Sequence, residues 1–222
     1  MLAILPLASA NTLAKWTFET SRPYGFRSPG TWFTNVVAEI GSGTASAFHS
    51  GVGLYSAGPG NGSSSAFGVT NSWTVGDFFQ FAVSTTGHQG ISLSYDQAGT
   101  AHGPGTFFLA YSTDGSSFTQ FGSNYQVLLG NWSPFTPSTA NTFVFDLSSL
   151  TSLNNQPIVY FRIVDASSVA IDGGTVNGYE DDRIDNFVIS AQLVPEPGTT
   201  VLAVLGGVCS LLLSARKRLG TR

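Results

Sequence analysis

The chain has 222 residues, with nine basic and thirteen acidic side chains and a formal net charge of −4. Between residues 11 and 194, five basic residues stand against twelve acidic ones, which makes this body a poor partner for nucleic acid or anionic lipid. The single cysteine, Cys209, lies in an apolar stretch near the C-terminus and excludes disulfide and thiol chemistry from the body.

Residues 1–10 have the features of a signal peptide. The segment MLAILPLASA is apolar and ends in Ala8-Ser9-Ala10, the small-x-small pattern that signal peptidases accept. A positively charged region before the apolar core is missing, so we expect a truncated signal peptide or a start further upstream. The alternative is an ordinary first strand beginning at Leu2.

Residues 11–193 predict an all-β domain. The chain has 26 glycines and 17 phenylalanines but only 10% charged residues, a mixture typical of short strands, glycine-rich turns and an aromatic core. Apolar and alternating stretches predict strands at 13–18, 32–39, 78–84, 91–96, 106–112, 117–121, 142–147, 158–164 and 184–191. Thr113-Asp114-Gly115-Ser116 predicts a tight hairpin turn. No segment before Thr199 keeps a helical period, although 147–153 fits one turn.

This strand pattern favours an antiparallel β-sandwich. Strands without crossover helices pack as two sheets or a barrel, and the strongly patterned first and last strands are expected to pair. We expect a jelly-roll sandwich rather than an immunoglobulin-like one, because the strands exceed the usual seven and the body exceeds about 100 residues.

The sequence offers little catalytic chemistry. His49, His88 and His102 are too scattered to form a zinc site, and no nucleophile motif is present. Glu180 and Asp182 could share a strand face, and a retaining glycoside hydrolase needs two carboxyl groups about 5–5.5 Å apart. The run 180–185 follows a turn-forming Asn-Gly, however, and is expected to be a solvated polar loop. We therefore expect no catalytic residues and no enzyme.

The four tryptophans are candidates for stacking on sugar rings. Trp132 lies in the expected loop Asn131-Trp-Ser-Pro134 and is the candidate for exposure. Trp16 alternates with Phe18 and is expected in the core. For each tryptophan, a purely structural role is the alternative.

The two ends of the body resemble carbohydrate-binding modules of the jelly-roll type. The resemblance lies in Phe18-Glu19 of the first strand and Ile184-Asp185-Asn186 of the last. It implies that Glu19 and Asp185 are ligands of a structural calcium ion, which suits hard oxygen donors from neighbouring strands.

An alternative role for Asp185 is to accept hydrogen bonds from backbone amides, with Arg183 or Arg162 neutralising its charge. No other cofactor is expected.

The C-terminal segment 194–222 predicts a membrane anchor. Residues 199–215 carry no charge, and as a helix they would measure about 25 Å, slightly less than a hydrocarbon core of about 30 Å. Arg216, Lys217 and Arg218 follow the apolar run and favour the cytoplasmic side, which places the body outside. The alternative is a buried C-terminal helix of the domain.

The same segment resembles the PEP-CTERM sorting signal of exported bacterial proteins. Pro195, Glu196 and Pro197 precede the apolar run and its basic end, in the order of that signal. The opening strand, the 113–116 hairpin and the closing strand also resemble other exported PEP-CTERM proteins. The resemblance implies processing near Pro195 by an exosortase, with a transient inner-membrane anchor before delivery to the cell surface or extracellular matrix.

These observations give three hypotheses in order. The first is a non-enzymatic exported β-sandwich sorted by its tail. The second is a polysaccharide-binding module with structural calcium. The third, an extracellular glycoside hydrolase, rests only on the run 180–185.

Overall fold

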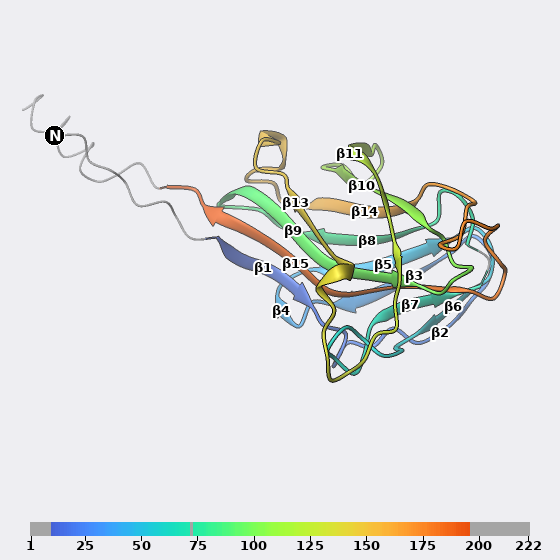
Figure 1. The fold of residues 1–222 in the computed structure, drawn as a ribbon. Helices are drawn as coiled ribbons and strands as arrows, with labels where there is room; N and C mark the ends of the chain where they lie inside the picture. The colour runs from blue at the N-terminus through green and yellow to red at the C-terminus, as the bar shows by residue number, and fades with distance from the viewer. Residues whose placement is uncertain (1–9, 72, 196–222) are drawn as a thin grey trace, which may run out of the picture. The chain divides into compact units, whose positions relative to one another are not determined.

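The computed structural model describes residues 10–71 and 73–195 (Figure 1). The chain divides into two compact units, Met1–Gln192 and Leu193–Arg222, and only residues 193–195 of the second are among the described residues. The strands are β1 (Asn11–Trp16), β2 (Gly25–Arg27), β3 (Thr31–Val37), β4 (Ile40–Gly41), β5 (Thr44–His49), β6 (Gly53–Ser56), β7 (Phe67–Thr70), β8 (Phe78–Val83), β9 (His88–Gly99), β10 (Thr106–Ser112), β11 (Thr119–Gln126), β12 (Leu128–Leu129), β13 (Thr142–Asp146), β14 (Val159–Asp165) and β15 (Asp181–Leu193). Two short 3-10 helices, η1 (Thr139–Asn141) and η2 (Thr151–Leu153), complete the described elements.

The strands form two sheets. A nine-stranded sheet has the order β12-β9-β15-β7-β6-β2, with β1 also beside β15, β4 beside β1, and β13 beside β9. A six-stranded sheet has the order β11-β10-β14-β8-β5-β3, and all its neighbours pair antiparallel. The short pair of β12 with β9 in the larger sheet is parallel. The all-β fold with antiparallel sheets is therefore confirmed.

An aromatic core joins the inner faces of the two sheets. Side chains alternate between the faces of a strand, so Phe79 and Phe81 of β8 turn inward while Phe78 and Gln80 turn outward. Phe81 stacks on Phe187 of β15 with ring centroids 3.5 Å apart, a contact between the two sheets. Aromatic stacking of this kind adds to the large apolar area that each buried ring contributes.

Two local predictions are confirmed. The first strand pairs with the last, with Asn11 opposite Ala191, so the two ends of the sandwich lie side by side (Figure 1). Strands β10 and β11 form the predicted hairpin, and Gly115 in its turn has a φ of 73°. A positive φ at this position explains the glycine.

No helix among the described residues is long and apolar enough to cross a membrane. The predicted span 199–215 lies outside the described residues.

Candidate functional site

The outer face of the six-stranded sheet carries a cluster of aromatic side chains. Trp32 of β3 lies 5.2 Å from Phe78 of β8 and 5.7 Å from Phe48 of β5, measured between ring centroids. Phe48 and Phe78 stack at 5.6 Å. Trp32 is 39% exposed, so the cluster presents an apolar surface to solvent.

Arg162 of β14 lies on the same face, beside these rings. Its guanidinium carbon lies 3.6 Å from the ring centroid of Phe118 and 3.9 Å from that of Phe78. Its Nε donates a hydrogen bond of 2.8 Å to the amide oxygen of Gln80. Burial lowers the pKa of Arg162 to about 10, so the group remains a cation at neutral pH.

A pocket of about 340 Å³ opens beside this arginine. It is lined by Gly76, Phe78, Phe108, Ala110, Phe118, Gln120, Arg162 and Val164. We call this pocket, together with Trp32, Phe48 and Gln80, the aromatic groove. Its lining contains no carboxylate, and apolar walls with a few polar groups are the usual make-up of a small-molecule site.

Two loops, which Asp185 and Asn61 hold in place, lie over part of the outer face of the nine-stranded sheet. The Asp185 carboxylate accepts hydrogen bonds from the backbone amide of Asn61 at 2.8 Å and from the hydroxyl of Ser63 at 2.6 Å. The Asn61 side chain in turn donates to the carbonyl of Ser138 and accepts from its amide. Gly60 allows this approach, because a Cβ there would overlap Asp185.

Glu19 binds the next residues of the same loop. It accepts a hydrogen bond from the backbone amide of Ser65 at 2.8 Å and one from the hydroxyl of Ser64 at 2.5 Å. The structure thus brings Glu19 and Asp185 to one loop. In these contacts, N–H and O–H groups donate to the carboxylate oxygens, whereas a calcium site would surround the ion with oxygen ligands. Backbone amides cap Asp185, as the alternative predicted, whereas Arg183 lies 3.8 Å from Asp181 and Arg162 lies on the other sheet.

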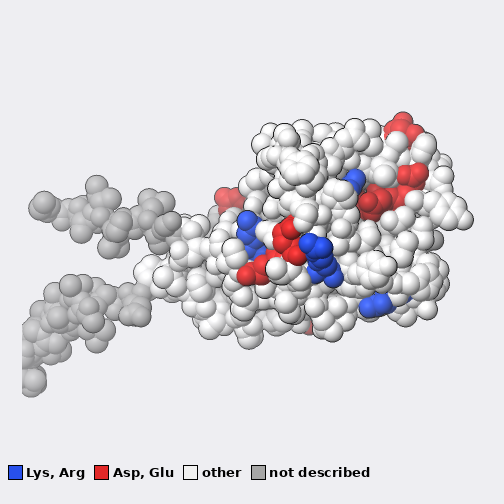
Figure 2. Space-filling model, turned by 90° about the horizontal axis from the view of Figure 1, so that it is seen from below, with Lys and Arg blue, Asp and Glu red and all other residues white. Residues whose placement is uncertain are grey.

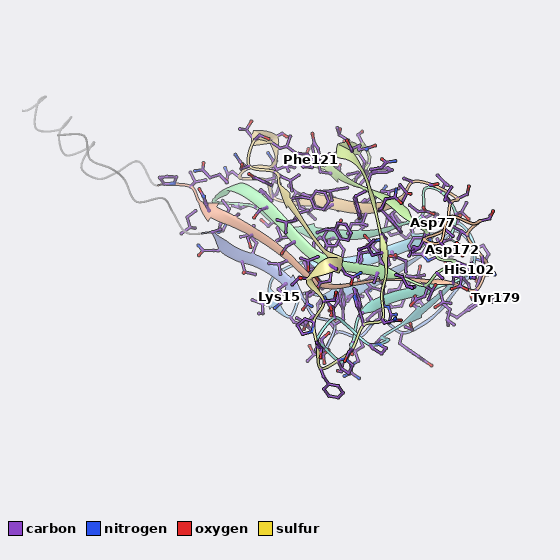
Figure 3. The ribbon with its side chains drawn as sticks, viewed as in Figure 1. Lys15, Asp77, His102, Phe121, Asp172 and Tyr179 are labelled. Atoms are coloured by element: carbon purple, nitrogen blue, oxygen red, sulfur yellow. The ribbon has the colours of Figure 1, made fainter. Side chains whose placement is uncertain are left out.

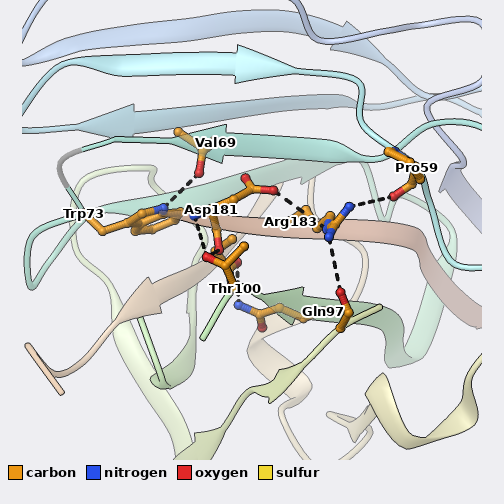
Figure 4. A network of polar contacts seen from close by, with 9 residues as sticks. Pro59, Val69, Trp73, Gln97, Thr100, Asp181 and Arg183 are labelled. Atoms are coloured by element: carbon orange, nitrogen blue, oxygen red, sulfur yellow. Dashed lines mark hydrogen bonds and ion pairs between the residues drawn. The ribbon is translucent and has the colours of Figure 1, made fainter. Parts of the chain in front are cut away.

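Trp132 is buried under the covered face, and the expectation that it is exposed is wrong. It is 8% exposed and packs against Ala66 and Ala98. The Arg183 guanidinium lies 5.4 Å from its ring and donates to the carbonyl of Gly130. It also donates to the carbonyl of Pro59 (Figure 4). The loop folds back on the sheet, so Trp132 offers no face to a ligand.

The run 180–185 is not a solvated loop. Strand β15 begins at Asp181, and Asp182 and Asp185 are fully buried. Asp182 accepts a hydrogen bond of 3.0 Å from Gln97 inside the sandwich, and burial raises its pKa well above the usual value. Glu180 lies instead 3.6 Å from His102. The two carboxyl groups proposed for a hydrolase therefore point to different surroundings.

The histidines lie in separate places. His49 is buried, and its Nδ1 lies 3.5 Å from a carboxylate oxygen of Asp77. Burial lowers the pKa of His49 to about 4. His102 lies 3.1 Å from Asp172, at the end of the sandwich where both are labelled in Figure 3. Within residues 10–71 and 73–195, no group of three or more His, Cys, Asp or Glu side chains is arranged to hold a metal ion.

Charge is sparse on the surface. Figure 2 shows small, separate groups of acidic and basic side chains on a mostly uncharged face. Among the sorting residues, Pro195 is described and exposed, whereas Glu196, Pro197, Arg216, Lys217 and Arg218 lie outside the described residues.

Sequence reasoning missed the groove. Trp32 was considered only as one of four tryptophans, and Arg162 only as a neighbour of Asp185. A signal was present in Phe78-Phe-Gln-Phe81, because apolar residues on both faces of a strand indicate that its outer face is also used or covered.

Comparisons with known proteins find only distant likenesses. No family model matches the chain, and a search of curated proteins finds no match. A family 11 carbohydrate-binding module of a Clostridium thermocellum cellulosomal cellulase is 12% identical, covering 86% of this chain and 99% of its own, with a TM-score of 0.41. A cleaved adhesin domain of Lys-gingipain from Porphyromonas gingivalis is 13% identical, covering 81% of this chain and 98% of its own, with a TM-score of 0.40. Likenesses at this level carry no argument about the present chain.

Proposed function

We propose that the chain is an exported glycan-binding protein of the jelly-roll type, and that the aromatic groove holds the ligand. The observation that carries this proposal is the exposed ring of Trp32, which packs on Phe48 and Phe78 beside Arg162 and its pocket. An aromatic face covers the apolar C–H face of a pyranose ring, while the Gln80 and Gln120 amides and the arginine are suited to its hydroxyl groups.

Substitution of Trp32 tests the proposal. A glycan array identifies ligands of the full-length protein, and calorimetric titration then compares the wild type with Trp32→Ala. We expect the affinity to fall by at least about tenfold, because a central aromatic contact is commonly worth 2 kcal/mol or more. The matched control is Phe135→Ala, which removes an aromatic ring that is 90% exposed on the other sheet's loops. A wild type that binds no glycan, or a Trp32→Ala variant that binds as well as the wild type, contradicts the proposal.

We propose binding without catalysis. Support comes from Glu180 and Asp182, whose carboxyl groups have different partners, and from the absence of acidic residues in the groove lining. An activity screen on polysaccharides tests this: hydrolysis that disappears in Glu180→Gln or Asp182→Asn would restore the glycoside hydrolase hypothesis.

Export and sorting form the second part of the proposal. Its support is the sequence order Pro195-Glu-Pro197, the uncharged run 199–215 and the basic cluster Arg216-Lys-Arg218. Mass spectrometry of the mature protein from its native host locates both ends. Loss of residues after about 194 supports exosortase processing, and an unprocessed chain in the cytosol contradicts it.

Calcium at Glu19 and Asp185 stays a prediction. The binding proposal does not require a cofactor. Calorimetric titration with millimolar calcium tests the ion directly: heat and a raised melting temperature, both lost in Asp185→Asn, are expected if it binds.

A further inference from the structure

Arg162 is a cation without a counter-ion. A guanidinium has five N–H donors, and the only hydrogen bond that Arg162 makes to the described part of the chain uses its Nε. It makes no ion pair with any residue of the described ranges 10–71 and 73–195. The pocket beside it is free of carboxylates. The donors of its two terminal nitrogens are therefore available to a ligand.

The neighbouring rings determine where a ligand can approach. At 3.6 Å and 3.9 Å, the guanidinium must lie nearly flat on Phe118 and Phe78, since an N–H pointing at a ring would hold the central carbon further away. The rings thus shield the faces of Arg162 and leave its edge, where the N–H donors lie. An edge with two parallel N–H groups matches the two oxygens of a carboxylate.

Arg183 is an arginine whose partners are supplied by the protein itself. It also lies over an aromatic ring, but it donates to the carbonyls of Pro59 and Gly130 and faces Asp181 at 3.8 Å. Arg162 has none of these partners, although it is partly removed from water. A desolvated charge without a partner is unfavourable, and an anionic ligand removes this cost.

We propose that the glycan bound in the aromatic groove is acidic and that Arg162 binds the carboxylate of a uronic acid residue. This inference rests on the proposed glycan-binding function. The sugar ring lies on the aromatic surface and its carboxylate meets the edge of Arg162, with Gln120 near enough to the pocket to take a hydroxyl group. No carboxylate lines the pocket. Carboxylates of the body that lie further than about 8 Å away weaken this contact little, because physiological salt largely screens them.

Pairs of acidic and neutral oligosaccharides test whether the bound glycan must carry a carboxylate. Full-length protein is titrated with oligomers of galacturonate, glucuronate and mannuronate, each compared with its methyl ester, which keeps the backbone and removes the charge. We expect at least one acid to bind about tenfold more tightly than its ester, the typical effect of a charge-assisted hydrogen bond. In Arg162→Gln, the acid and its ester should bind equally. Arg27→Gln removes the same charge outside the groove and should keep the preference.

The outcomes separate the two proposals. Equal binding of acid and ester by the wild type overturns the acidic ligand. A preference that persists in Arg162→Gln overturns Arg162 as the group that binds the carboxylate. Both results leave glycan binding intact. Binding of neutral or sulfated glycans without any uronate has the same meaning. Binding of no glycan at all overturns both proposals.

Discussion

The two outer faces of the sandwich use similar side chains to different ends. Each has an arginine over aromatic rings: Arg183 over Trp132 on the nine-stranded sheet, and Arg162 over Phe78 and Phe118 on the six-stranded sheet. On the first face, loops cover the rings and their carbonyls accept the arginine donors. On the second face, Trp32 is 39% exposed, and the terminal nitrogens of Arg162 have no hydrogen-bond partner among the described residues.

This difference is the reason for proposing the six-stranded sheet as the binding face, because residue type alone does not separate the two faces. An aromatic ring or an arginine can serve either a structural or a ligand-binding role. The two roles are distinguished by whether other residues of the chain supply the partners of these side chains. On the nine-stranded sheet, Asp185 holds the covering loop in place through buried hydrogen bonds. In the described part of the six-stranded sheet, no carboxylate lines the groove that could hold a loop over it in this way.

Removal of Asp185 should have the largest effect. Asp185→Ala leaves the Asn61 and Asn186 amides and the Ser63 hydroxyl without their acceptor, so we expect the free energy of unfolding to fall by about 3 kcal/mol. Urea denaturation measures this loss. Glycan affinity of the folded variant should be unchanged, and a weakened affinity would show that the two faces are not independent.

Substitution of the two arginines should change the free energy of unfolding by different amounts. Arg183→Gln should lower the free energy of unfolding by about 1–2 kcal/mol, because two loop carbonyls lose a charged donor. Arg162→Gln should change stability by less than about 1 kcal/mol, since it loses only the bond to Gln80 and its ring contacts. Thermal unfolding of both variants checks the pair, and a reversed order would mean that Arg162 is the structural arginine.

The carboxyl groups of the covered face should make the free energy of unfolding depend on pH. Burial raises the pKa of Asp181 to about 7 and that of Asp185 to about 6, against about 4 in an unfolded chain. Between these values the folded state holds protons that the unfolded state has released, so the free energy of unfolding should fall as pH rises from about 4 to about 7. Each carboxyl should contribute on the order of 1 kcal/mol, because water and local relaxation moderate the cost of burial.

Asp181→Asn supplies the control for this prediction. Denaturation across this pH range should show a flatter profile in the variant than in the wild type. His49, whose pKa burial lowers to about 4, acts in the opposite direction and is present in both proteins. An unchanged profile in Asp181→Asn would contradict the raised pKa of Asp181.

Local pattern was enough to predict the all-β class and much of the strand set. Strand β10 has the predicted bounds, and the 113–116 hairpin follows from its Asp-Gly pair. The prediction missed β5 and β7, because their alanine, serine and glycine residues weaken the apolar signal.

The candidate site depended on contacts that local sequence does not contain. Trp132 is buried because its loop is tied down by Asn61, which bonds Ser138 77 positions away in the chain. Asp182 is buried beside Gln97 of β9, the neighbouring strand in the same sheet, 85 positions away in the chain. In contrast, Trp32 stays exposed because no loop of the described chain covers it to the same extent. Tertiary contacts therefore bury Trp132, the tryptophan that was expected to be exposed.

The indole N–H signals of the four tryptophans test the binding face most directly. Trp16, Trp73 and Trp132 are at most 8% exposed, whereas Trp32 is 39% exposed in the aromatic groove. Nuclear magnetic resonance of the nitrogen-labelled protein, with the Trp32 signal assigned from Trp32→Phe, follows each indole during titration with a bound glycan. We expect the Trp32 signal to shift with saturation while the Trp132 signal stays in place. A shift at Trp132 with none at Trp32 would place the ligand on the opposite face and contradict the assignment.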